Sequence, residues 1–182
     1  YGMRVLLVLF MIHEFGLTDS EAFSLYALYT TLVELGGIFG GIIADRFLGL
    51  RRTIFFGGWT IVSGHISLIF ESTPCFYLGL GLIIIGTSLF RSNIPALIGK
   101  SYKEDDPRRD AGYTLYYTGI NFGGFLASLL CGIIGEMYGY HVGFGLAAFG
   151  MILGMIAFGF GKKMFLDESK QISKQLNFAL LF

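Results

Sequence analysis

Charged residues are scarce in this sequence, and the patterns that mark metal, redox or hydrolytic chemistry are missing. Only 14% of the 182 residues are Asp, Glu, Lys or Arg, whereas soluble domains carry about 25%. Thirteen basic residues balance thirteen acidic ones, so the net charge gives no signal for nucleic acid as a partner. Cys75 and Cys131 lack metal-ligand or redox spacing, and neither HExxH nor GxSxG occurs. We therefore expect neither an enzyme nor a metal or cofactor site.

What the sequence has instead is long apolar runs, with 54% hydrophobic residues and 27 glycines. The runs are too long for barrel strands and lack alternation with period two, so they predict an all-α membrane protein. A run of twelve residues rises about 18 Å as a helix and is too short to span a bilayer core of about 30 Å. We therefore interpret the chain as a fragment that begins inside its first helix. The expected segments are 1–12, 21–44, 53–70, 76–99, 112–135 and 142–161.

The basic residues predict the orientation of these segments. Eleven of the thirteen fall after the second, fourth and sixth segments, and the other two, Arg4 and Arg91, lie inside helices. By the positive-inside rule, the charged loops and the tail face the cytoplasm of a cell-membrane protein. We expect residues 1–163 to form a transmembrane bundle and residues 164–182 a cytoplasmic linker. The loop and tail residues are Arg46, Arg51, Arg52, Lys100, Lys103, Arg108, Arg109, Lys162, Lys163, Lys170 and Lys174.

Polar side chains at one depth of the expected bundle point to a lined cavity. Arg91 interrupts the apolar run 78–100, where a charge costs at least a few kcal/mol and usually faces a substrate or ion path. The alternative is a structural arginine that snorkels or pairs within the fold. Glu34 and Asn121 lie at a similar distance from the cytoplasmic helix end, and Tyr117 shares a helical stripe with Asn121. A cavity lined by both signs of charge is favoured over polar residues that only join helices.

Two further positions have open interpretations. Pro95 removes a hydrogen bond and predicts a kink in the fourth helix, which either serves a binding site or is merely tolerated. His65 lies midway along the third segment and is either a proton-relay group or a hydrogen-bonded packing residue. We favour the packing role because no partner is evident in the sequence.

Three stretches carry a resemblance to a known family. The loop at 40–52, GGIIADRFLGLRR, resembles the motif between the second and third helices of major facilitator transporters. The opening YGMR and the stretch 83–132 resemble the proton-dependent oligopeptide transporter family, and the similarity extends over the chain as that family's N-terminal six-helix half. The loop residues that match the motif, and to which the resemblance assigns gating, are Gly41, Asp45, Arg46, Gly49, Arg51 and Arg52.

The resemblance implies proton-coupled symport of di- and tripeptides, driven by the proton gradient without a cofactor. It implies that Tyr1 and Arg4 line the peptide site, that Arg91 helps to bind the peptide carboxylate, and that Asn121 hydrogen-bonds the peptide. Glu34 and Tyr117 complete the substrate-binding set that we expect. The partners would be peptide, protons, membrane lipid and a C-terminal six-helix half, with which Asp45 would make contact to close the cytoplasmic side.

The sequence departs from the family at the expected site. Arg91 and Ser92 stand where the family usually has lysine and proline, and a buried arginine does not give up its proton as a lysine does. Glu34 stands where an uncharged or aromatic residue is usual, so it adds a carboxylate to the cavity. A transporter of another small solute, such as nitrate, an amino-acid derivative or a drug, is the alternative function.

Overall fold

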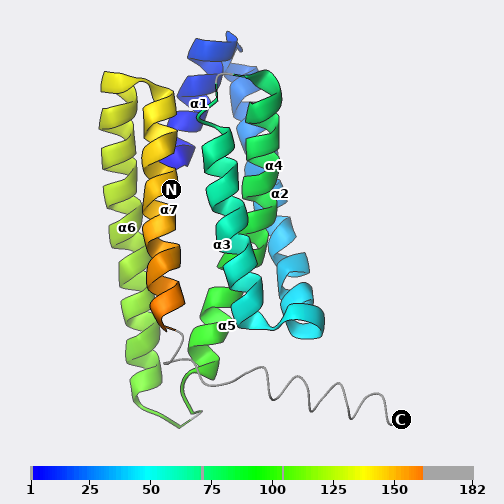
Figure 1. The fold of residues 1–182 in the computed structure, drawn as a ribbon, viewed down its shortest axis with the longest axis vertical. Coiled ribbons are helices and arrows are strands. Elements are labelled where there is room, and N and C mark those ends of the chain that lie inside the picture. Colours follow the sequence, from blue (N-terminus) through cyan, green and yellow to red (C-terminus); the bar gives the residue numbers. More distant parts are fainter. Residues whose placement is uncertain (1, 71, 104, 162–182) are drawn as a thin grey trace.

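The computed structural model describes residues 2–70, 72–103 and 105–161, and these contain helices and no strand. The helices run along the long axis of the molecule in alternating directions (Figure 1). Tyr1 and the expected linker 164–182 lie outside the described residues. The elements are α1 (Gly2–Phe15), α2 (Asp19–Ile43), the π-helix η1 (Ala44–Leu48), α3 (Leu50–Ser67), α4 (Thr73–Arg91), α5 (Asn93–Lys100), α6 (Arg108–Tyr138) and α7 (Tyr140–Phe160).

The helices have the length and composition of membrane spans. Four stretches are long and apolar enough to cross a bilayer, at residues 19–48, 73–100, 108–138 and 140–160. Helix α3, with 18 residues, is about 27 Å long, and the apolar part of α1, Leu6–Phe15, is shorter. The predicted all-helical membrane class is confirmed.

Most expected segments match one helix, but the fourth is two. Helix α4 ends at Arg91, Ser92 is a turn residue, and α5 begins at Asn93. Pro95 explains why the break lies here. Proline has no backbone N–H to donate to the carbonyl of Arg91, four residues earlier, and its ring clashes with that carbonyl. The predicted disturbance of the fourth helix by Pro95 takes the form of a one-residue break at Ser92 within a single apolar span, Thr73–Lys100. Proline interrupts the helix at Arg91, and the Tyr113 hydroxyl donates to the Pro95 carbonyl at 3.1 Å.

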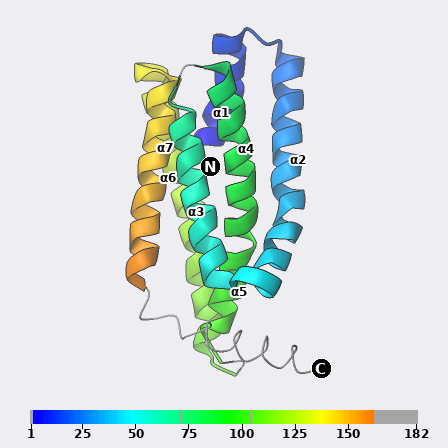
Figure 2. The same cartoon turned by 45° about the vertical axis from the view of Figure 1, so that its right-hand side comes forward.

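Helices α3 and α4 form the central pair, with α7 on one side and α2 on the other (Figure 2). Glycines allow their backbones to approach closely. A Cβ at Gly57 would lie 2.8 Å from the Gly86 carbonyl oxygen, and one at Gly64 would lie 2.9 Å from that of Gly79. The two contacts are seven residues apart on each helix, so one seam of small residues runs along the pair.

An aromatic cluster joins α1 to α4 and α7. The Phe10 ring lies 5.4 Å from Phe76 of α4 and 5.3 Å from Phe144 of α7, both measured between ring centroids. All three side chains are buried, and aromatic pairs at such distances add to the free energy of burial. The cluster fixes α1 against α4 and α7, and therefore fixes the position of Arg4 on α1.

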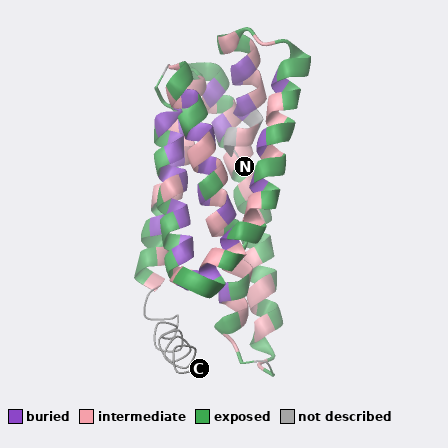
Figure 3. Ribbon diagram, turned by 90° about the vertical axis from the view of Figure 1, so that its right-hand side faces the viewer, coloured by how far each residue is buried: buried purple, intermediate pink, exposed green. Residues whose placement is uncertain are grey.

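Burial differs strongly among the helices (Figure 3). Ten of the eighteen residues of α3 are buried, whereas only Cys131 and Gly135 are buried among the 31 residues of α6. The α6 surface carries large apolar side chains, as is usual for a surface that meets lipid or protein in a membrane. Its exposed members include Leu115, Tyr117, Phe122, Phe125, Leu129 and Leu130.

Candidate functional site

An ion pair between α2 and α4 marks the centre of the candidate site. Nη1 of Arg91 contacts Oε1 of Glu34, although the two residues are 57 positions apart. The Arg91 side chain is 52% exposed and the Glu34 side chain is 62% exposed. Because exposed pairs contribute only about 0–1 kcal/mol to stability, the pair holds the fold together weakly. Both groups remain accessible to another charged molecule.

Small residues of α2 position this pair. A Cβ added at Gly36 would overlap the Ser88 hydroxyl, and one at Gly40 would overlap the Ser88 carbonyl oxygen. The buried Asn93 side chain then donates to the Gly40 carbonyl at 3.1 Å and to the Leu89 carbonyl at 2.8 Å. This amide fastens the start of α5 to α2, so the break after Arg91 is held in place.

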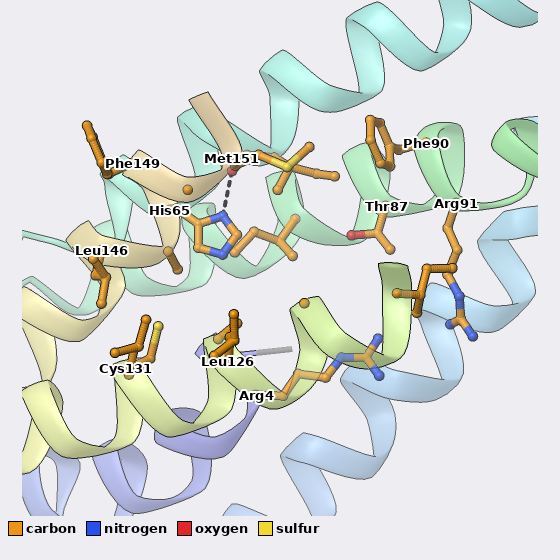
Figure 4. Close-up of a pocket in the computed structure, with 18 of the residues that line it drawn as sticks. Arg4, His65, Thr87, Phe90, Arg91, Leu126, Cys131, Leu146, Phe149 and Met151 are labelled. Carbon is orange, nitrogen blue, oxygen red and sulfur yellow. Dashed lines mark hydrogen bonds between the residues drawn. The ribbon is translucent and has the colours of Figure 1, made fainter. Parts of the chain in front are cut away.

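Arg4 and Arg91 both line one cavity of about 610 Å³ between the helices. The Arg4 guanidinium carbon lies over the Tyr29 ring, 5.9 Å from its centroid, within the range of a cation–π interaction. Figure 4 shows both arginines directed toward the same end of the cavity. The other lining residues are Ile61, His65, Ile83, Thr87, Phe90, Ile94, Tyr116, Ile120, Gly123, Leu126, Ala127, Leu130, Cys131, Leu146, Ala147, Phe149, Gly150 and Met151.

Asn121 and Tyr117 lie beside this cavity and do not line it. The Asn121 side-chain amide donates to the Tyr117 carbonyl of its own helix at 2.9 Å, and both residues are exposed. The α6 residues that line the cavity, Tyr116 and Ile120 among them, are displaced by one position, or about 100°, from the expected polar stripe. In the structure, Arg4 and Arg91 therefore line the same cavity, and Glu34 forms an ion pair with Arg91. It places Asn121 and Tyr117 on a neighbouring face.

The apolar walls of the cavity are the part that sequence reasoning missed. Residues such as Tyr116, Ile120 and Ala127 recur at helical spacing on α6, and this apolar stripe could have been read beside the polar one. His65 on α3 also lines the cavity. It is buried, and its Nδ1 donates to the Ile61 carbonyl at 2.8 Å, so the histidine has the hydrogen-bonded packing position that we favoured.

The loop motif forms a tight π-helical turn between α2 and α3. Gly49 has φ of 79°, which only glycine adopts easily, and its N–H donates to the Ala44 carbonyl at 2.9 Å. The Thr53 hydroxyl donates to the Gly49 carbonyl at 2.9 Å. One turn of π-helix, a form that occurs often at functional sites, therefore directs the chain from α2 into α3.

The charged members of the motif do not pair with one another among the described residues. Asp45 is exposed and has no ion pair within the part of the chain that the structure describes. Arg51 instead lies over the Phe158 ring of α7, 5.9 Å from its centroid, while Arg46 and Arg52 are exposed. A Cβ at Gly41 would meet nothing within 4 Å. Among the described residues, Asp45 therefore forms no ion pair with the arginines of its own motif.

The loop before α6 has a local charge pair of its own. The Arg108 side chain donates to Asp106 through Nη2 at 2.9 Å, and the Arg108 backbone N–H donates to it at 2.9 Å. These bonds lower the pKa of the Asp106 carboxyl below its ordinary value. Across residues 2–70, 72–103 and 105–161, no three His, Cys, Asp or Glu side chains are placed to hold a metal ion.

Comparison with known families identifies what the chain is similar to. The sequence profile described as "POT family" matches residues 51–178. The chain is 42% identical over 169 residues to the uncharacterized transporter YclF of Bacillus subtilis, covering 90% of this chain and 34% of that protein. It is 40% identical over 173 residues to a di-/tripeptide transporter of Lactococcus lactis, covering 89% of this chain and 34% of that protein. The chain thus spans about a third of the length of these relatives.

Solved structures agree in fold. A crystal structure of a peptide transporter POT in complex with sulfate superposes with a TM-score of 0.87 at 37% identity, covering 99% of this chain and 40% of that one. A POT family transporter in complex with 5-aminolevulinic acid superposes with a TM-score of 0.86 at 28% identity, covering 100% of this chain and 41% of that one. The helical bundle described above is therefore one that membrane transporters use.

Proposed function

The chain belongs to the POT family, and on that premise we propose that it forms the N-terminal bundle of a proton-coupled symporter of di- and tripeptides. It is a multi-pass membrane protein, and its family is one of transporters. We propose further that the substrate is a di- or tripeptide, that the transporter takes it up, and that the proton gradient alone drives this uptake, with no cofactor. One relative is named a di-/tripeptide transporter, and the identity of 40% over most of this chain supports the same substrate class.

The observation that carries the proposal is the accessible cation at the break between α4 and α5. Arg91 is more than half exposed and has Glu34 as its partner. A guanidinium stays charged at any working pH and binds a carboxylate through two parallel hydrogen bonds. A peptide carboxylate can therefore replace the Glu34 carboxylate on Arg91 without leaving a charge unpaired, provided that Glu34 finds a cation in turn.

The peptide's amino group is that cation. Glu34 then binds the peptide amine and Arg91 binds the peptide carboxylate. The single ion pair between Glu34 and Arg91 is replaced by two ion pairs with the substrate. Arg4 adds a second positive charge at the same end of the cavity. We assign Asn121 and Tyr117, which are exposed beside the cavity, to the peptide backbone, because the Asn121 amide both donates and accepts and the Tyr117 hydroxyl does the same. We assign Tyr1 to the same site from the family resemblance.

The gating role belongs to the loop between α2 and α3. Asp45 is exposed on the π-helical turn η1, which ends at Gly49. We propose that Asp45, with Arg46, Arg51 and Arg52 nearby in sequence, contacts a C-terminal half and helps to close the cytoplasmic side. Gly41 allows α2 to approach that half closely. By the distribution of basic residues, this loop and the tail face the cytoplasm of the cell membrane.

Uptake of a labelled dipeptide by the full-length transporter in liposomes tests the proposal. We expect accumulation that depends on an inward proton gradient and collapses when a protonophore is added. Uptake that ignores the gradient would contradict symport, and uptake of nitrate in place of peptide would contradict the substrate class.

A second candidate substrate is an amino-acid derivative. The observation that favours it is the structure of a POT family transporter in complex with 5-aminolevulinic acid, which superposes over the whole of this chain. Such a molecule also has an amine and a carboxylate, so the same Glu34 and Arg91 pair suits it. Uptake of labelled 5-aminolevulinic acid, measured beside uptake of the labelled dipeptide by the same liposomes, separates the two.

A further inference from the structure

The outward side of α3 forms one continuous exposed stripe. The buried residues of α3 pack on α4, as at Gly57 and Gly64, or on α7, as at Gly58, where a Cβ would overlap the Met155 side chain. Between them, every third or fourth residue is exposed, and α3 lies between α7 and α4 in the view of Figure 1. The residues of this stripe are Arg52, Phe55, Phe56, Trp59, Ser63 and Ile66.

The stripe suits contact with lipid because its hydroxyl groups are satisfied within α3. The Ser63 hydroxyl donates to the Trp59 carbonyl at 3.0 Å. The half-buried Thr60 beside the stripe donates to the Phe56 carbonyl at 2.8 Å. Inside a bilayer, polar groups must find their partners within the protein, because no water is there to bind them. Beyond Arg52, the stripe therefore offers an apolar surface to its surroundings.

Aromatic side chains gather at one end of the stripe. The Phe55 ring centroid lies 6.2 Å from that of Phe56 and 6.3 Å from that of Trp59. All three residues are exposed and belong to the first ten residues of α3. Tryptophan is enriched where a membrane meets water, at the level of the lipid headgroups. This end of α3 therefore lies near a membrane surface, and the distribution of basic residues makes it the cytoplasmic one.

Positive charge lies at the same end. Arg52 is exposed and forms no ion pair within the part of the chain that the structure describes. It precedes Trp59 by seven residues, or about 10 Å along the helix. Arg51 adds a second charge over the Phe158 ring of α7. The N-cap Gly49 has no side chain to cap α3, so the positive end of the helix dipole also favours an anion here.

We propose that this end of α3 binds an anionic phospholipid, with the phosphate on Arg52 and an acyl chain along Phe56 and Trp59. A guanidinium matches phosphate oxygens through two parallel hydrogen bonds. A phosphate free in solution would use Arg52 but would gain nothing from the aromatic rings, whereas a lipid uses both. The inference goes beyond the proposed function, because it concerns the membrane around the bundle and holds for any substrate.

The fluorescence of Trp59 tests the inference directly. The full-length transporter is reconstituted into vesicles of phosphatidylcholine and phosphatidylglycerol, with bromine on the acyl chains of one lipid or the other as the quencher. The difference between the wild type and Trp59→Phe isolates the Trp59 signal. We expect phosphatidylglycerol to be enriched beside Trp59 about fivefold over its share of the bilayer, as one basic residue near an anionic surface predicts. Arg52→Ala should lower the enrichment to at most twofold, and Arg52→Lys should keep most of it.

Arg108→Ala is the matched control, because Arg108 is an exposed basic side chain in the loop before α6. This variant should keep the fivefold enrichment. A loss as large as in Arg52→Ala would reduce the effect to a general attraction of basic surfaces and would overturn the inference. Equal quenching by both brominated lipids in the wild type would do the same. Quenching by neither would mean that protein, a C-terminal half or a second copy, covers the stripe, and would also overturn it. Dipeptide binding to the same vesicles reports on the proposed function separately.

Discussion

The seam between α3 and α4 and the middle of α6 are built from the same residue, glycine, to opposite effect. At the seam, a Cβ at Gly57 or Gly64 would lie within 3 Å of a backbone oxygen of α4. On α6, a Cβ at Gly119, Gly123 or Gly132 would meet nothing within 4 Å. Glycine in the seam lets two backbones pack, and glycine in α6 leaves space. Residue type alone therefore does not say whether a region is tight or open.

The residues that hold the bundle together also differ from those that form the candidate site. The seam and the aromatic cluster hold α1, α3, α4 and α7 together, while the ion pair is exposed where α2 meets α4 and the cavity has α6 along one wall. The breakable Glu34–Arg91 contact is on the exposed side. We infer that the seam acts as a rigid frame and that substrate contacts use the open side.

The largest effect should come from filling the seam. Gly57→Leu places atoms against the Gly86 carbonyl and the Phe90 backbone nitrogen, and overpacking costs about 1–3 kcal/mol or more when backbone must move. We expect a strongly lowered melting temperature or loss of monodisperse protein. Gly154→Leu on α7, where a Cβ meets nothing within 4 Å, is the control and should melt like the wild type. Equal melting of both variants would remove the distinction between a tight seam and an open surface.

The next effect concerns Arg91 on the open side. A charge-assisted hydrogen bond contributes about 1.5–3 kcal/mol, so Arg91→Ala should weaken dipeptide binding roughly tenfold to a hundredfold. Arg91→Lys keeps the charge and should retain substantial peptide exchange in liposomes. Because the pair with Glu34 is exposed, both variants should melt near the wild-type temperature. A large loss of melting temperature in Arg91→Ala would mean that Arg91 belongs to the frame.

Much of this arrangement could be predicted from the sequence because it follows from helix length and depth. Glu34 lies nine residues before the end of α2, and Arg91 lies nine residues before the end of α5. Counting along apolar runs therefore predicted their common level. Counting could not give the rotation of α6, which decides whether Tyr116 or Tyr117 faces the cavity, because that rotation depends on packing against α1 and α7. It also missed the position of the helix break, since Pro95 acts on the Arg91 carbonyl four residues earlier.

A smaller effect is expected from the loop between α2 and α3. Asp45→Asn removes a charge that has no ion pair among the described residues, so folding and dipeptide affinity should change little. Transport should fall several-fold, because we assign Asp45 to closure against a C-terminal half. Uptake and equilibrium binding, measured on the same full-length preparation, check this. A parallel loss of both would place Asp45 with the binding residues.

The smallest effect is a pH dependence at the start of α6. The hydrogen bonds from Arg108 lower the pKa of Asp106 in the folded state, so their contribution is present above the ordinary carboxyl pKa and is lost as the pH falls through the lowered value. We expect the protection of the Arg108 amide from exchange, measured relative to an unprotected amide at the same pH, to fall below that pH and to stay constant between pH 6 and 8. Asp106→Ala should show the lower protection at every pH. Unchanged protection in this variant would contradict the role of the pair.

The central claim is that Arg91 binds the carboxylate of the substrate, and calorimetry on the full-length transporter tests it most directly. The wild type and Arg91→Ala are each titrated with a dipeptide and with the same dipeptide as its C-terminal amide, which lacks the negative charge. We predict that the wild type prefers the free carboxylate by about tenfold to a hundredfold and that Arg91→Ala binds both ligands equally. An Arg91→Ala variant that still prefers the carboxylate as strongly as the wild type would contradict the account.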